Sequence, residues 1–168
     1  MKKTILILAV VFTAFTTITK AQSEVAKNEF NKTLTVYFDT KNALAKDNVN
    51  LAVVGAKSLL TNLATFPVKS LSAAQQIIWK TQSEEIKKAA NAMVLQKDLT
   101  AQRKSFWPLS SAMLKLTKAL KLNKNDVYIQ YCPMAKKSWL NEVETVQNPF
   151  YGSMMYDCGE ITETIAKK

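Results

Sequence analysis

The chain has 168 residues and a net charge of +10, with no histidine and a single arginine, Arg103. The missing histidine excludes Ser-His-Asp and Cys-His catalysis, and it removes the commonest zinc ligand and the usual general base. Positive charge carried by lysine is typical of a solvated surface, because nucleic-acid and phosphate clamps rely on arginine. We therefore expect no nucleic-acid partner.

Residues 1–21 have the pattern of a cleaved signal peptide. Two lysines precede a short apolar stretch, residues 5–15, and the tripeptide TKA that ends at Ala21 has the small-x-small pattern of a cleavage site. The apolar stretch is too short to span a bilayer comfortably, and no later stretch is apolar enough to do so. We expect an exported protein, periplasmic or secreted, whose mature part, residues 22–168, forms one domain without a transmembrane segment.

Four amphipathic helices are predicted from apolar residues that recur at spacings of three and four. Their bounds and caps are 24–46, then 48–65 with Asp47 as N-cap, then a helix from Ser70 or Ser72 to about Lys97, then one that starts at Asp98. The residues predicted to face inward are Phe30, Leu34, Tyr37, Phe38, Leu44, Ala45, Leu51, Ala52, Gly55, Leu59, Leu63, Leu71, Ala74, Ile78, Ile86, Ala89, Met93, Phe106, Leu109, Met113, Leu116 and Leu120. The opposite face of the first helix is predicted to take most of the following polar residues: Lys32, Asp39, Lys41 and Lys46. Short connections favour an antiparallel four-helix bundle over residues 24–122.

Pro108 lies inside the fourth helical pattern. It has no backbone N–H, and its ring crowds the preceding turn, so we expect a kink there or a break with a new helix starting near it.

The pattern changes after Asn123, and we expect a small C-terminal cap of strands and loops over residues 123–168. Residues 126–132 alternate in the manner of a strand, and residues 139–147 are compatible with a second short strand. Asn148-Pro149 is a predicted turn. The last eight residues fit either a strand or a helix.

The cap holds both cysteines and three of the six methionines: Cys132, Met134, Met154, Met155 and Cys158. Thiolates and thioethers are soft donors that select copper(I) or similar ions over magnesium and calcium. These five residues are therefore the candidate ligands of a soft-metal site. Four aromatic residues are candidates to shield it from water: Tyr131, Trp139, Phe150 and Tyr151.

A disulfide between Cys132 and Cys158 is the alternative, because two cysteines in an exported chain usually pair. It would close a loop of roughly 27 residues, for which chain entropy gives about 3–4.7 kcal/mol of stabilisation. A reactive thiol is a third possibility. Metal binding and the disulfide can also be two redox states of one site, reduced and loaded or oxidised and empty.

The pieces YCPMA, NPFYG and MMYDCGE, with AQRKSFWPLSSAML at 101–114, resemble a bacterial domain of unknown function. That domain occurs in exported proteins and fused to periplasmic adaptor subunits of copper/silver-type heavy-metal efflux pumps. The resemblance covers roughly residues 30–165. It places Cys132 and Met134 on the Cys-Pro-Met positions and Cys158 on the Cys-Gly position. One departure is that Lys136-Lys137-Ser138 leads directly to Trp139, where the family often has a small insertion with glycine.

The resemblance implies metal handling in the cell envelope, with an efflux-pump adaptor or another envelope protein as partner. We expect a protein that binds copper(I) or a similar soft ion and acts as a buffer or donor. The alternative is a disulfide-stapled interaction module without metal. An enzyme that uses Asp126, Asp157 and Glu160 is not expected, because nothing in their spacing singles them out.

Overall fold

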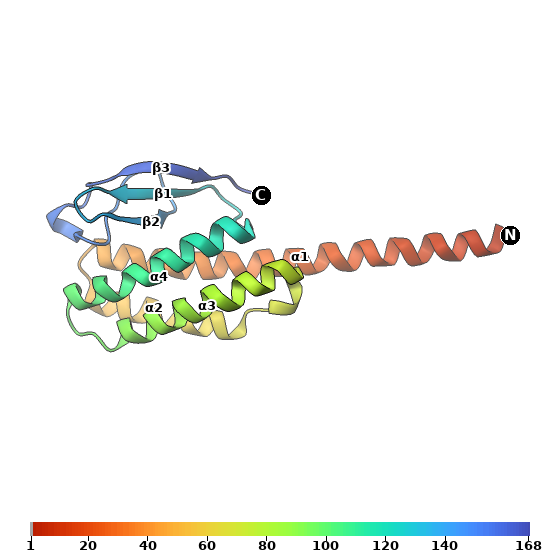
Figure 1. The fold of residues 1–168 in the computed structure, drawn as a ribbon, viewed down its shortest axis with the longest axis horizontal. Helices are drawn as coiled ribbons and strands as arrows, with labels where there is room; N and C mark the ends of the chain where they lie inside the picture. Colours follow the sequence, from red (N-terminus) through yellow and green to blue (C-terminus); the bar gives the residue numbers. More distant parts are fainter. Residues whose placement is uncertain (1) are drawn as a thin grey trace.

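The computed structural model describes the backbone of residues 2–168 and the side chains of residues 24–168. Four helices pack in antiparallel pairs, and a three-stranded sheet forms a second layer over them (Figure 1). The elements are α1 (Lys2–Ala45), α2 (Val49–Thr65), η1 (Val68–Ser70), α3 (Ala73–Val94), α4 (Leu99–Leu120), β1 (Val127–Cys132), β2 (Lys137–Asn141), η2 (Gly152–Met154) and β3 (Glu160–Ile165). The predicted fold class, a mainly helical bundle with a small cap, is confirmed. The predicted signal peptide, residues 1–21, lies outside the described side chains, and its cleavage stays a prediction.

The helix starts follow local capping chemistry. The cap of α2 is Asn48, whose side chain accepts a hydrogen bond from Leu51 N at 3.0 Å, so the assignment of this cap to Asp47 is wrong. Ser72 caps α3 in a reciprocal pair with Gln75, which decides between the two predicted serines. Asp98 caps α4 as predicted.

Helix α4 runs from Leu99 to Leu120 without a break at Pro108, so the predicted new helix start there is wrong. The carbonyl that a proline leaves without its intrahelical partner belongs to the residue four positions earlier, here Lys104. Lys104 and Pro108 are both exposed, so water can satisfy that carbonyl and the helix continues.

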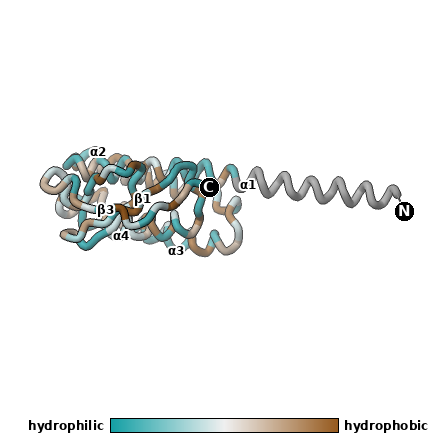
Figure 2. Tube along the Cα trace, turned by 90° about the horizontal axis from the view of Figure 1, so that it is seen from above, coloured by the Kyte–Doolittle hydropathy of each residue, from teal (hydrophilic) through white to brown (hydrophobic). Residues whose placement is uncertain are grey.

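Hydrophobic and hydrophilic residues alternate along the helices (Figure 2), and the apolar side chains fill the space between them. Two predicted core positions are wrong: Leu51 is 57% exposed and Ala74 is also exposed. In α2 the small residues set the contact, since a Cβ on Gly55 would lie 2.3 Å from Thr40 Oγ1 of α1. The Leu51 side chain lies on the solvent side of α2. In α3 the first buried side chain is that of Trp79, which stacks on Phe66.

Lys41 is fully buried, so its assignment to the outer face of α1 is wrong. Its ammonium donates to Asn141 Oδ1 and to Gln147 Oε1 at 2.9 Å, and Glu142 Oε2 lies 3.2 Å away. Desolvation by burial lowers the pKa of Lys41 to about 8, although the Glu142 carboxylate opposes this shift. The cap contacts α1 on a face other than the apolar face that packs in the bundle. A prediction based on one apolar face therefore does not show that Lys41 is buried.

The sheet has the order β2-β1-β3, and both pairings are antiparallel. Pairing with β1 makes the C-terminal segment a strand, with Val127 opposite Ile165. The second predicted strand, 139–147, is only partly correct because β2 ends at Asn141. There the chain folds back, and Asn141 Nδ2 donates to Val143 O and Thr145 O at 3.0 and 2.8 Å.

One hydroxyl connects the sheet to both α1 and α4. Tyr37 Oη of α1 lies 2.7 Å from Ser110 Oγ of α4 and accepts a hydrogen bond from Leu140 N of β2 at 3.1 Å. Burial raises the pKa of Tyr37 far above its ordinary value, so the hydroxyl stays protonated. Among the residues searched in the described part of the chain, none of the helices combines the length and apolar character needed to cross a membrane.

We expect Lys41→Met to lower the free energy of unfolding at pH 7 by about 3 kcal/mol, because buried oxygens lose their cation. The unfolded chain, in which lysine keeps its ordinary pKa, binds more protons than the folded one between pH 8 and 10.5. The contribution of Lys41 to stability therefore rises with pH through this window.

Urea unfolding of the parent and of Lys41→Met at pH 7, 8, 9 and 10 measures this effect, and the difference in unfolding free energy should widen as pH rises. Lys32→Met removes the same charge from an exposed position of the same helix and serves as control. A difference that stays constant from pH 7 to 10 would contradict the assignment.

Candidate functional site

The two cysteines meet at one edge of the sheet. Cys132 ends β1 and Cys158 lies two residues before β3, and the pairing of Tyr131 with Glu160 brings them together. Their sulfur atoms are 3.0 Å apart, and neither is part of a disulfide. The expectation that the two cysteine segments meet, which the metal and disulfide hypotheses share, is confirmed. Cys132 is fully buried, whereas Cys158 is partly exposed.

The chain turns tightly after Cys132 and directs backbone N–H groups at its sulfur. Ala135 N donates to Cys132 Sγ at 3.4 Å, and Lys136 N donates to Cys132 O at 2.8 Å. Lys136 takes a left-handed conformation, with φ at 53°, to close the turn. A concave arrangement of N–H groups of this kind favours an anionic atom, here a thiolate.

The two thiols have different acidities. Burial raises the pKa of Cys132, but hydrogen bonds from the Cys158 thiol, from the N–H groups of Ala135 and Met134 and from the Asn148 side chain lower it more, so the net pKa is lowered. The hydrogen bond to Cys132 and burial raise the pKa of Cys158. Cys132 is therefore the more acidic thiol of the pair, and Cys158 keeps its proton to higher pH.

The three methionines lie on the two cysteine segments, and the side chains of two of them are mainly exposed. Met134 is 61% exposed and Met154 is 74% exposed, whereas Met155 is partly buried. Cys158 N donates to Met155 O at 3.2 Å, which fixes the backbone between them. Within the described side chains, no group of three or more His, Cys, Asp and Glu residues is placed to hold a metal ion.

Asn148 organises the segment that carries Cys158, and sequence analysis identified it only as a turn residue. Its side chain is fully buried. Asn148 Nδ2 donates to Cys158 O at 2.9 Å, and Asn148 Oδ1 accepts from Phe150 N and Tyr151 N at 2.8 and 3.2 Å. An asparagine before proline is the signal of a local side-chain-to-backbone turn, but the sequence alone does not show the contact with Cys158.

Two of the four predicted aromatic shields, Trp139 and Phe150, are buried and meet edge to face with ring centroids 6.0 Å apart. A Cβ on Gly159 would lie 3.0 Å from Trp139 Cη2 and from Tyr131 O. The backbone beside Cys158 therefore packs closely against the Trp139 ring and the β1 backbone. Any residue other than glycine at position 159 would also be strained, because the backbone φ there is 155°. Lys137 Nζ lies 5.2 Å from the centroid of the Phe150 ring.

Arg103 and Asp47 connect the segment that begins at Asn148 to the helices. Arg103 Nη2 pairs with Asp47 Oδ1, and Arg103 Nε donates to Pro149 O at 2.9 Å. Neither residue has a predicted role at the site. The available signals were the presence of a single arginine in a lysine-rich chain and its place in the AQRKSFWPLSSAML stretch.

Of the acidic residues considered for catalysis, Asp126 lies far from Glu160. Asp126 precedes the end of β1 that pairs with Ile165, whereas Glu160 pairs with Tyr131 near the other end. Four residues of strand separate these two ends, which is about 13 Å at the usual rise. Asp126 Oδ1 instead accepts a hydrogen bond from Lys167 N.

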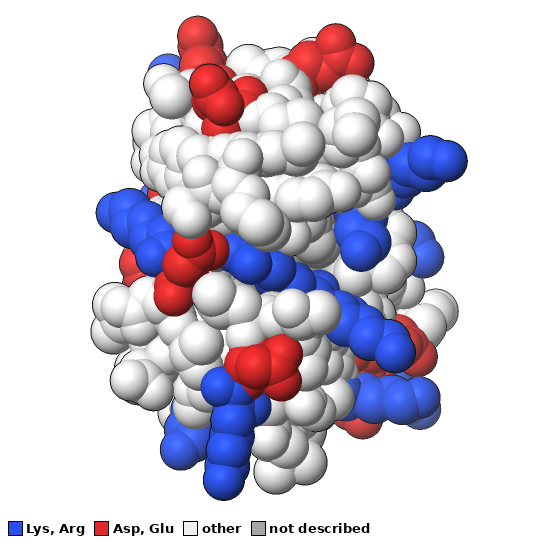
Figure 3. Space-filling model, turned by 90° about the vertical axis from the view of Figure 1, so that its left-hand side faces the viewer, with Lys and Arg blue, Asp and Glu red and all other residues white. Residues whose placement is uncertain are grey.

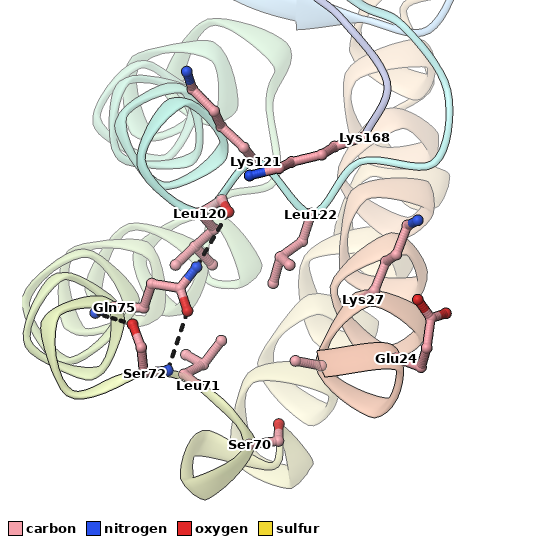
Figure 4. Close-up of a pocket in the computed structure, with 11 residues that line it drawn as sticks. Glu24, Lys27, Ser70, Leu71, Ser72, Gln75, Leu120, Lys121, Leu122 and Lys168 are labelled. Carbon is pink, nitrogen blue, oxygen red and sulfur yellow. Dashed lines mark hydrogen bonds between the residues drawn. The ribbon is translucent and has the colours of Figure 1, made fainter. Parts of the chain in front are cut away.

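A hollow of about 530 Å³ lies at the opposite end of the bundle, next to the start of α3 (Figures 1 and 4). Lys27, Lys121 and Lys168 line it together with Glu24. Ser72 N and Gln75 N are already paired with the Gln75 and Ser72 side chains, so the capping box occupies donors that a bound anion would need.

The charges on the end that carries η2 are also mixed, with basic side chains across its middle and acidic ones at the top (Figure 3).

We expect Asn148→Ala to lower the free energy of unfolding by about 3 kcal/mol, because two N–H groups and one carbonyl lose their partner at about 1–3 kcal/mol each. Asn125→Ala, at an exposed position of the same domain, should stay within about 0.5 kcal/mol of the parent. Thermal or urea unfolding of both variants tests this. Equal effects would mean that Asn148 does not organise the segment.

The fold and the site define a small helical protein with an antiparallel sheet cap and a dithiol at the edge of that sheet. A family described as protein of unknown function (DUF3347) matches residues 33–125, and the chain belongs to this family. The matched residues include most of the helical layer and end before β1, so they do not include the cysteines. No curated protein and no solved structure gave a match to the chain.

Proposed function

We propose that the protein binds a soft metal ion, copper(I) or a similar ion such as silver(I), through Cys132 and Cys158. The observation that carries the proposal is the meeting of two thiols from separate segments, with Ala135 N directed at the Cys132 sulfur. Thiolates are soft ligands that copper(I) prefers, and two sulfurs are enough for an ion of low coordination number. The role is binding rather than catalysis.

The methionines are the candidates for a third ligand. Met134 follows Cys132 by two residues, and Met154 and Met155 precede Cys158 within four. The exposed thioethers of Met134 and Met154 have the rotational freedom to turn toward an ion bound at the partly exposed Cys158. Such flexible donors suit a protein that accepts and releases its ion.

The biological setting of the proposal rests on the sequence. The signal-peptide pattern supports a mature protein that works in the periplasm or outside the cell. The resemblance to a domain fused to adaptor subunits of copper/silver-type efflux pumps favours a buffer or a metal donor. Its partner would be such an adaptor or another envelope protein.

A disulfide-stapled interaction module is the second candidate, and the 3.0 Å separation of the two sulfurs favours it. Sulfurs this close need little movement to form a bond. An oxidising compartment also favours pairing. The two candidates use the same sulfur atoms, so reduced protein would bind the metal and oxidised protein would not.

A copper(I) competition titration against a chromophoric chelator tests the metal hypothesis on reduced protein. We expect Cys132→Ser to abolish tight binding, because a neutral hydroxyl is a hard donor that cannot replace a thiolate. Met134→Leu keeps the size and apolar character of the side chain, so it should weaken binding and leave the melting temperature nearly unchanged. A Met154→Leu/Met155→Leu double variant completes the set.

Two outcomes of this titration would count against the proposal. A reduced parent that fails to compete with the chelator would remove the metal function and leave the interaction module. If Met134→Leu and the double variant both bind as tightly as the parent, the thioethers are not ligands.

The disulfide hypothesis predicts the reverse pattern. A count of free thiols on the mature protein should then give none, and Cys132→Ser should cost about 2–5 kcal/mol of unfolding free energy under oxidising conditions. Met134→Leu should be silent in every assay. Urea unfolding with and without a reductant measures the cost, and an unchanged midpoint would contradict a stabilising disulfide.

A further inference from the structure

We propose that Arg103 is a positioning residue of the dithiol site: together with Asp47 it holds the segment 148–154 and so sets how closely Cys158 approaches Cys132. The proposal deepens the proposed function, and it rests on that function only for the identity of the bound ion. The effect on the two sulfurs can be measured without any metal.

Arg103 has polar partners on two separate parts of the chain. Its Nη2 donates to Leu44 O at 2.8 Å and pairs with Asp47 Oδ1, both near the connection between α1 and α2. Its Nε donates to Pro149 O at 2.9 Å in the cap. Only an arginine has several donors in a fixed planar fork that can serve these partners together, and a lysine has one point charge.

Asp47 continues the connection into the cap. Its Oδ2 accepts a hydrogen bond from Ser153 N at 3.1 Å and another from the Ser153 hydroxyl. A Cβ on Gly152 would lie 1.9 Å from Asp47 Oδ1 and 2.1 Å from Arg103 Nη2, so the cap backbone lies directly against the ion pair. Asp47 has a left-handed backbone, with φ at 57°, which is uncommon outside glycine. The ion pair and Ser153 form one clamp over this turn.

The clamped segment leads to Cys158 through two contacts. Asn148, which precedes the clamped Pro149, donates to Cys158 O at 2.9 Å. Met155, which follows η2, accepts a hydrogen bond from Cys158 N at 3.2 Å. Cys158 is thus held on both its N–H and its carbonyl by residues that flank the clamp.

The two cysteines differ in what fixes them. Cys132 belongs to the central strand β1, and its partner across the ladder is Lys137 of β2. Cys158 lies between η2 and β3, outside the ladder. A change in the clamp should therefore move Cys158 and leave Cys132 in place, so the distance between the sulfurs is the quantity that Arg103 controls.

The test measures the equilibrium in which the protein dithiol and glutathione disulfide give the protein disulfide and two glutathione molecules. Each metal-free variant is equilibrated in glutathione buffers, quenched with acid and alkylated after unfolding, and the oxidised fraction is read by mass. We expect Arg103→Met to lower the equilibrium constant about tenfold, which raises the reduction potential by about 30 mV. Arg103→Lys keeps the charge without the fork and should recover only part of this loss.

Lys118→Met is the matched control. Lys118 lies on the same helix and pairs with Glu163 of β3 at 2.6 Å, so its loss breaks another contact between α4 and the cap away from the clamp. We expect its equilibrium constant to equal that of the parent. A change as large as that of Arg103→Met would show a general loosening of the cap and would overturn the proposal.

Asp47→Asn and Ser153→Ala keep the test decisive if Arg103→Met does not fold. Both should shift the potential in the same direction as Arg103→Met, and Ser153→Ala should do so least because it removes one hydroxyl. Unchanged potentials in all folded clamp variants, even with lower melting temperatures, would make Arg103 merely structural and overturn the inference. A parent that fails to bind copper(I) would sink the proposed function and leave this result intact.

Discussion

The packing of the small sheet on α1 and α4 is the contact on which the rest of the structure depends. Three short strands are marginal alone and need an apolar partner for one face. Leu140 of β2 and its ladder partner Ile129 of β1 are buried on the same face of the sheet, and Tyr37 connects α1, α4 and β2 through one protonated hydroxyl. Without this packing the two cysteine segments have no common edge at which to meet.

Two basic side chains secure the cap, one on each side of Asn148. Lys41 binds Asn141 and Gln147 before it, and Arg103 binds Pro149 after it. Both cations approach oxygen atoms of a segment with little regular structure, where backbone and amide groups need partners. The buried lysine and the single arginine thus act in the architecture of the cap, whereas most of the remaining lysines stay on the surface.

Prediction from the sequence is most accurate where a signal is local and repeated. The four helices, the caps Ser72 and Asp98 and the first strand follow from spacing and capping chemistry within a few residues. It failed for Lys41, because its burial depends on residues about a hundred positions later in the chain. The cysteines were selected by residue type alone, and the role of Asn148 at Cys158 went unseen because a hydrogen bond across ten residues has no periodic signature.

The sequence by itself determined the helical layer, a cap of different character and the gathering of soft sulfur in that cap, since composition and periodicity are properties of short segments. Only the tertiary structure decided that the last segment is a strand, because its pairing with β1 selects one of two conformations that the residues allow. It also decided that Cys132 is the buried partner and Cys158 the more accessible one. The physical reason is that strand pairing and burial arise from contacts between distant segments, and these exist only after the chain has folded.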